Sequence, residues 1–178
     1  MMGGPLHDGI RESSVEPAIF RAMMRHQACA VSIIAVGAPG RRFGLTATAV
    51  SSLSDNPPAL LVCVNRKASA HDVIVDCGCF SLNVLSADQI KMAQTFSGSS
   101  ELHGEARFAA GKWGTLNTGA PVLQGALINI DCELAGHHTF ETHSAFVGNA
   151  VAMAGGKSAS PLLYFRGNYF DLNNGAIT

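Results

Sequence analysis

The stretch GLTATAVSSLS, residues 44–54, decides how this chain is interpreted. It combines almost no side-chain bulk with small hydroxyl residues on alternating positions, Thr46, Thr48 and Ser52. Small side chains let a flat ligand approach the backbone closely, while hydroxyl and peptide N–H groups can bond its polar rim. A fused heteroaromatic ring with several carbonyls and nitrogens suits such a wall. An ordinary Thr- and Ser-rich edge strand is the alternative that this stretch alone leaves open.

Composition narrows the class of protein. The chain has 178 residues, which is about one domain. Its formal net charge of −1 provides no positive electrostatic field to attract nucleic acid. Hydrophobic residues make up 47% and charged residues 14%, which excludes disorder. No apolar run reaches the roughly 18 residues of a membrane helix. We expect residues 1–12 to form a flexible leader and residues 13–178 a single domain.

Cysteine usage indicates the compartment. Five cysteines are an odd and scattered set, unlike a secreted disulfide framework, and they are expected to pack as small hydrophobic side chains. Residues 1–11 lack the apolar region of a signal peptide. The sequence therefore predicts a cytoplasmic protein.

Turn signals divide the chain into short strands with few helices. Ser13 with Glu16, and Ser86 with Gln89, form capping-box patterns that open two of three expected helices. The Gly-rich segment 97–119 is expected to cross the surface. This pattern predicts a mainly β protein with a closed antiparallel barrel. The helices are expected over 15–25, 71–76 and 86–96, and the strands over 28–36, 43–54, 59–64, 80–85, 126–135, 144–153 and 162–165.

Three other residue patterns give only weak evidence for a function. Gly156-Lys157-Ser158 resembles the end of a Walker loop but lacks the glycine required five positions earlier. His137, His138 and His143 lie near two glutamates, yet loop histidines are more often solvated than metal-bound, so no metal is predicted. A serine hydrolase is disfavoured because the chain has no G-x-S-x-G elbow.

A short cationic loop follows the strand expected over 59–64. Asn65-Arg66-Lys67-Ala68-Ser69 supplies two cations, an amide and a hydroxyl, which together suit a phosphate. A solvated basic turn is the alternative reading of this loop by itself.

The order of these motifs, from about residue 20 to residue 170, resembles the flavin reductase family with the FMN-binding split-barrel fold. Within that family the chain resembles the reductases of 4-hydroxyphenylacetate monooxygenase and of the pyrimidine-degrading Rut pathway. The blocks that carry the resemblance are FRAMMRHQACAVSII (20–34), GLTATAVSSLSDNPPALLVCVNR (44–66), FSLNVLS (80–86), FSG (96–98), RF (107–108), TGAPVL (118–123), ETHSAFVG (141–148) and PLLYFRGNYF (161–170).

The resemblance implies an antiparallel split β-barrel with a few flanking helices. It also implies an NAD(P)H:flavin oxidoreductase that passes a hydride from NADH or NADPH to FMN or FAD. The reduced flavin would serve a partner monooxygenase. Members of the family are homodimers with the cleft at the subunit interface. A non-catalytic flavin carrier, another split-barrel enzyme and a pure interaction module remain as alternatives.

The same resemblance assigns roles to individual residues. His143 is expected near the nicotinamide as the catalytic residue, although a structural histidine is the alternative. Phe96 is expected to approach the flavin, with plain core packing as its alternative. A structural role is the alternative for the hydroxyl residues. The cofactor-binding set is Thr46, Ala47 and Thr48 along the ring and ribityl chain, Ser51 and Ser52 toward the phosphate, Asn65, Arg66 and Ser69 on the phosphate, Phe96, and Arg166 with Tyr169 on the nicotinamide side.

Overall fold

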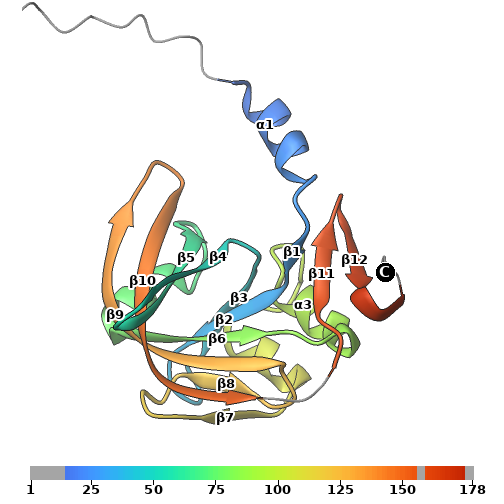
Figure 1. Cartoon of the computed structure of the whole chain (residues 1–178). Helices are drawn as coiled ribbons and strands as arrows, with labels where there is room; N and C mark the ends of the chain where they lie inside the picture. The colour runs from blue at the N-terminus through green and yellow to red at the C-terminus, as the bar shows by residue number, and fades with distance from the viewer. Residues whose placement is uncertain (1–14, 156–158, 175–178) are drawn as a thin grey trace, which may run out of the picture.

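The computed structural model describes residues 15–155 and 159–174. Its main sheet is antiparallel throughout, with the strand order β3-β2-β6-β9-β10-β5-β4 (Figure 1). This confirms the predicted mainly β split barrel. The strands are β2 (Ser32–Val36), β3 (Phe43–Ala47), β4 (Val50–Asp55), β5 (Pro58–Asn65), β6 (Cys79–Val84), β9 (Ile128–Thr139) and β10 (His143–Gly155).

The two edge strands of this sheet, β3 and β4, are joined by only Thr48 and Ala49. Ala47 still pairs with β2, whereas Val50 already pairs with β5, so the chain changes partner within two residues. This covalent connection between opposite edges closes the sheet into a barrel. The strand and its exit predicted over 43–54 are instead two strands, because residues 48–49 leave the ladder with β2 before the ladder with β5 begins.

The remaining elements surround the barrel. The strand predicted over 28–36 is divided between β1 in a small sheet and β2 in the main one. The leader (1–12) and Gly156–Ser158 lie outside the described residues, as does Ser13. The other elements are α1 (Pro17–Met24), β1 (Cys29–Ala30), α2 (His71–Cys77), η1 (Ala87–Gln89), α3 (Ile90–Phe96), η2 (Gly104–Ala110), β7 (Trp113–Thr115), β8 (Pro121–Leu123), β11 (Leu162–Phe165), β12 (Asn168–Asp171) and η3 (Leu172–Asn174).

The predicted helix starts have different outcomes. The Ser86–Gln89 capping box is present, with the backbone N–H of Ser86 donating to Gln89 Oε1 at 3.1 Å. By contrast, α1 begins at Pro17 behind Glu16, which provides no side-chain cap. Proline suits the first turn of a helix because the amide it lacks has no intrahelical partner there.

A second core cluster lies outside the barrel, between β2 and α3. Phe108 is 2% exposed and packs edge-on against Phe96, with the two ring centroids 5.0 Å apart. Arg107 is also buried and donates to the carbonyls of Gly44, Phe96, Ser97 and Leu102. The surface path predicted for 97–119 is therefore wrong in its middle, because aromatic packing draws η2 inward.

Gly44 matters for this packing because β3 passes directly over Phe96. A Cβ at Gly44 would lie 2.8 Å from Phe96 Cε1 and 3.0 Å from the carbonyl oxygen of Ile34. We expect Gly44→Ala to lower the free energy of unfolding by about 1–3 kcal/mol, the usual range for overpacking. Urea denaturation measures this. Gly136→Ala on β9 is the matched control, since a Cβ there meets nothing within 4 Å. Equal stability of the two variants would contradict the prediction.

Candidate active site

A cleft of about 790 Å³ lies where the chain crosses from β3 to β4, and we name it the crossing cleft. One side is formed by residues 48–51, which we call the wall of small residues, together with β5. The other side is formed by α1 and β1, and Tyr164 of β11 also lines the cleft. Its volume falls within the range of ordinary ligand sites, roughly 300–1,000 Å³. The residues of the wall side are Thr48, Ala49, Val50, Ser51, Leu61 and Cys63.

The hydroxyls predicted to line the wall do not all face this cleft. Thr48 and Ser51 do line it. Thr46 instead donates its hydroxyl to the carbonyl of Ala93 on α3 at 2.6 Å, which ties β3 to the helix. Ala47 is 8% exposed and belongs to the barrel core. Of these four residues, therefore, only Thr48 and Ser51 present side chains to a ligand in the crossing cleft.

A second cleft, of about 530 Å³, lies at the end of β5, and we name it the loop cleft. Asn65 and Arg66, two of the residues expected to bind phosphate, both line it. The amide oxygen of Asn65 accepts from the backbone N–H of Lys67 at 2.9 Å, so the loop folds back on itself. The residues of the loop cleft are Asn65, Arg66, Lys67, His71, Asp72, Thr139, Glu141 and Thr142.

His143 lies beside this loop. It is exposed at the start of β10 and lines a hollow that Arg66 shares. Its Nδ1 lies 2.8 Å from the hydroxyl of Thr142. The register pairs His143 with Asn65 on β5, so the catalytic candidate and the cationic loop occupy one edge of the barrel.

Strand β5 connects the two clefts. Cys63 lines the crossing cleft and Asn65 lines the loop cleft. Two residues along a strand span about 7 Å. A ligand lying along β5 can therefore contact both sites. Ser52 and Ser69 are exposed but line neither cleft.

Phe96 is 1% exposed and packs on Phe108 and Trp113. It therefore supports β3 from beneath and presents almost no surface to a ligand. Its burial beneath the small-residue strand matches the core alternative that its sequence position left open.

The nicotinamide-side candidates lie on β11 and β12. Tyr169 packs edge-on against Tyr164, which lines the crossing cleft, with ring centroids 5.3 Å apart. Burial raises the pKa of the Tyr169 phenol, and Tyr164 adds to this, so the phenol stays neutral. Arg166, in the turn between the strands, has a φ of 49° and donates its backbone N–H to the carbonyl of Arg25 at 2.9 Å. The turn therefore holds the end of α1.

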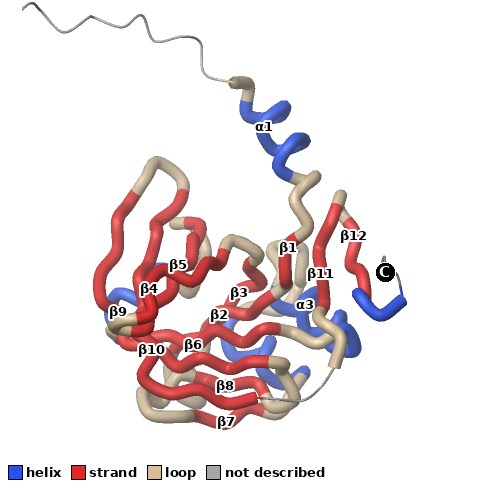
Figure 2. The backbone as a smooth tube through the Cα atoms, viewed as in Figure 1, coloured by secondary structure: helices blue, strands red, loops and turns tan. Residues whose placement is uncertain are grey.

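His143 lies on one hairpin of the chain, and Arg166 and Tyr169 lie on another. Figures 1 and 2 show the β9–β10 hairpin and the β11–β12 hairpin on opposite sides of the molecule, with α1 standing apart above them. The sequence-based site is thus divided into one part near the loop cleft and one part near α1.

Other candidate chemistry is absent from the described part of the chain. No group of three or more His, Cys, Asp and Glu side chains is placed to hold a metal ion there. His137 instead stacks on Phe146, and His138 packs edge-on against Phe140. All five cysteines are free, and burial raises the pKa of Cys132 to about 12. Among residues 15–155 and 159–174, no helix is long and apolar enough to span a membrane.

Among the polar residues of the loop cleft that sequence reasoning missed, His71 has the most contacts of its own. His71 begins α2, is 7% exposed, and bonds at both ring nitrogens. Its position directly after the cationic loop was the available signal, but nothing in the sequence shows that its partner is Ser144, 73 residues away.

A closed antiparallel barrel with a small-residue wall and an adjoining cationic loop defines a ligand-binding split barrel, and comparisons with known proteins identify its family. A model of the flavin reductase like domain matches residues 24–173. RutF of Agrobacterium fabrum, named an FMN reductase (NADH), is 41% identical over 150 residues, covering 84% of this chain and 85% of that protein. The chain belongs to the flavin reductase family and is an oxidoreductase.

Solved structures agree with this assignment. A Haemophilus somnus protein assigned to the flavin reductases is 36% identical and aligns with a TM-score of 0.84, over 88% of this chain and 99% of that one. The flavin reductase component BorF of a bacterial two-component tryptophan halogenase is 28% identical. It has a TM-score of 0.80 over 88% of this chain and 98% of that one.

Proposed function

We propose that this enzyme transfers a hydride from NADH to FMN and releases the reduced flavin to a separate oxygenase. The names of the RutF relatives support the pair of substrates, and the similarity to a two-component halogenase reductase supports the release. The observation that carries the proposal is the crossing cleft, where the wall of small residues leaves backbone and hydroxyl groups accessible along one face. FAD and NADPH are alternative substrates for the same site. We infer a cytoplasmic enzyme because all five cysteines are free thiols.

The residues present fit a flavin phosphate. The crossing cleft accepts a flat ring against Thr48, Ala49 and Ser51. Further along β5, the loop cleft offers Asn65 and Arg66 to a phosphate, with Ser69 exposed beside them. A bound flavin supplies the ring that accepts the hydride, so no side chain has to act as a nucleophile. The task of the protein is to orient the two substrates and exclude competing reactions.

His143 is suited to orient a nicotinamide. Thr142 Oγ1 lies 2.8 Å from Nδ1, and in the tautomer where this hydroxyl donates to Nδ1 the ring carries its proton on Nε2. That N–H can donate to the carbonyl oxygen of a carboxamide. Because His143 is exposed, the donor is available to a diffusing substrate.

We further propose that the enzyme is a homodimer. Helix α1 buries none of its residues and exposes Ile19, Phe20, Met23 and Met24. An eight-residue helix is only marginally stable in water without tertiary packing. This apolar face therefore requires a partner surface. Phe20 and Met24 of this face also line the crossing cleft, so a second copy packed here would lie beside the ligand.

An anaerobic assay tests the activity. We expect catalytic amounts of the protein to bleach the visible absorbance of excess FMN over many turnovers when NADH is added without oxygen. FAD and NADPH in separate reactions identify the preferred substrates. A flavin carrier would give no more bleaching than NADH and FMN without protein, and that result would contradict the proposed function.

Removing the His143 imidazole tests its role. We expect His143→Ala to lower kcat roughly tenfold, the value of one good hydrogen bond, while flavin binding is unchanged. Steady-state NADH oxidation and flavin fluorescence titration measure the two quantities. His138→Ala is the matched control, since His138 is exposed in the same hairpin and packs on Phe140. Equal kcat in the two variants would show that His143 takes no part in orienting nicotinamide.

The oligomeric state tests the role of α1. We expect sedimentation velocity to give twice the chain mass of 18.6 kDa for the native protein. Replacing Phe20 and Met23 by serine should give the single-chain mass, because it removes apolar area from the exposed face. Val75→Ser on α2 is the control, since Val75 is 39% exposed outside this face. A native protein that sediments as one chain would overturn the dimer.

A further inference from the structure

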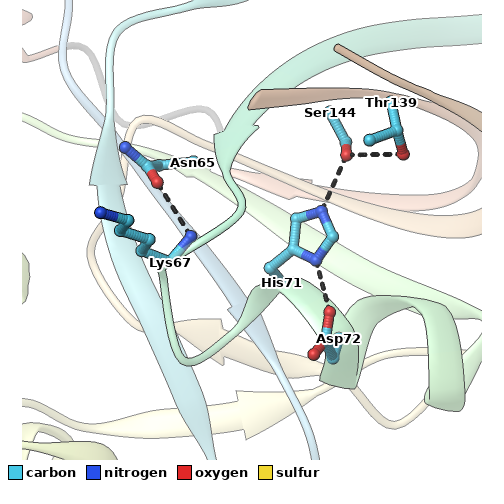
Figure 3. Close-up of polar contacts among 6 residues, drawn as sticks. All are labelled: Asn65, Lys67, His71, Asp72, Thr139 and Ser144. Carbon is cyan, nitrogen blue, oxygen red and sulfur yellow. Dashed lines mark hydrogen bonds and ion pairs between the residues drawn. The ribbon is translucent and has the colours of Figure 1, made fainter. Parts of the chain in front are cut away.

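A chain of hydrogen bonds crosses from α2 to the β9–β10 hairpin (Figure 3). His71 Nδ1 lies 2.6 Å from Asp72 Oδ1, and Nε2 lies 2.8 Å from Ser144 Oγ. Ser144 Oγ lies in turn 3.1 Å from Thr139 Oγ1. Thr139 and Ser144 close the hairpin from its two strands, since they face each other in the β9–β10 register. One imidazole thus joins the end of the cationic loop to both strands of the hairpin.

The direction of these bonds follows from their chemistry. An ionised Asp72 carboxylate only accepts, so Nδ1 of His71 carries the proton and donates to it. In the neutral ring Nε2 then accepts from the Ser144 hydroxyl, which accepts from Thr139. Both ring nitrogens of His71 and the Ser144 hydroxyl therefore have a hydrogen-bond partner.

This arrangement is not a hydrolytic triad, although it contains aspartate, histidine and serine. Ser144 is 0% exposed and His71 is 7% exposed. A hydroxyl without solvent access cannot attack a substrate. The ring of His71 also packs edge-on against Phe146, which is fully buried, with centroids 5.2 Å apart. The packing and both hydrogen bonds hold the imidazole in a single orientation.

The cationic loop is therefore held to the hairpin at both of its ends. At its start, the backbone N–H of Arg66 donates to the carbonyl of Thr142 at 3.0 Å, and Arg66 Nη1 donates to that of Glu141 at 3.3 Å. Two residues after the loop, at the start of α2, His71 bonds to Ser144. The neighbour of Ser144 along β10 is His143.

We propose that His71 is a positioning residue that couples the anion-binding loop to the hairpin carrying His143. The inference rests on the proposed function and deepens it. A phosphate held by the loop fixes the hairpin through His71 and so improves the use of a phosphorylated flavin. Riboflavin, which has no phosphate, does not benefit from this coupling.

The test compares FMN and riboflavin as substrates of the full chain at saturating NADH. We expect the native protein to show a higher kcat/KM for FMN than for riboflavin. His71→Phe keeps a ring against Phe146 but removes both hydrogen bonds, and it should lower the FMN:riboflavin ratio roughly tenfold with riboflavin unchanged. His71→Gln, whose amide can reach Ser144, should restore part of the ratio. Ser144→Ala, which removes only one hydroxyl, should lower the ratio in the same direction and serves if His71→Phe does not fold.

His138→Phe is the matched control, because it makes the same exchange on the exposed side of the same hairpin. We expect it to leave the ratio unchanged. An unaltered ratio in both His71→Phe and Ser144→Ala would overturn the coupling while the reductase function stands. An equal fall for both flavins would show a merely structural role and also overturn it. A native ratio of one would instead reject the phosphate role of the loop, and the coupling with it.

Discussion

The change of pairing partner at Thr48 and Ala49 is the constraint on which the rest of this structure depends. Two residues carry the chain from one edge of the sheet to the other, so the sheet must curl until those edges meet. The crossing is made of small residues, and their exposed backbone becomes one side of the crossing cleft. Closure of the barrel and exposure of a ligand wall are therefore consequences of the same local event.

Polar side chains then hold the elements of the barrel in a single arrangement. Thr46 ties β3 to α3, Arg107 satisfies the carbonyls where α3 ends, and His71 ties α2 to the β9–β10 hairpin. Arg107 and His71 lie where solvent cannot substitute for a lost partner, so an alternative packing would leave donors or acceptors unpaired. In this fold, polar side chains mainly set positions, and a few exposed ones remain for chemistry.

Much of the fold and part of the site could be predicted. Taken with the family resemblance, the alternating hydroxyls and the Asn65–Ser69 loop predicted a flavin site, and the structure places Asn65 and Arg66 near His143. Phe96 could not be resolved from sequence, because an aromatic residue at a helix end suits a ligand and a core equally. His71 was missed since its meaning depends on Ser144, and no local pattern links residues 73 positions apart.

The sequence by itself determined the strand-rich class, the family and the kinds of side chain available to a ligand, because periodicity, turn chemistry and motif order are local properties of the chain. Only the tertiary structure decided that residues 43–54 are two strands at opposite edges, that Thr46 faces a helix, and that the β9–β10 and β11–β12 hairpins lie on opposite sides of the molecule. These outcomes depend on which distant strands pair, and pairing is set by packing of the whole barrel rather than by any single stretch.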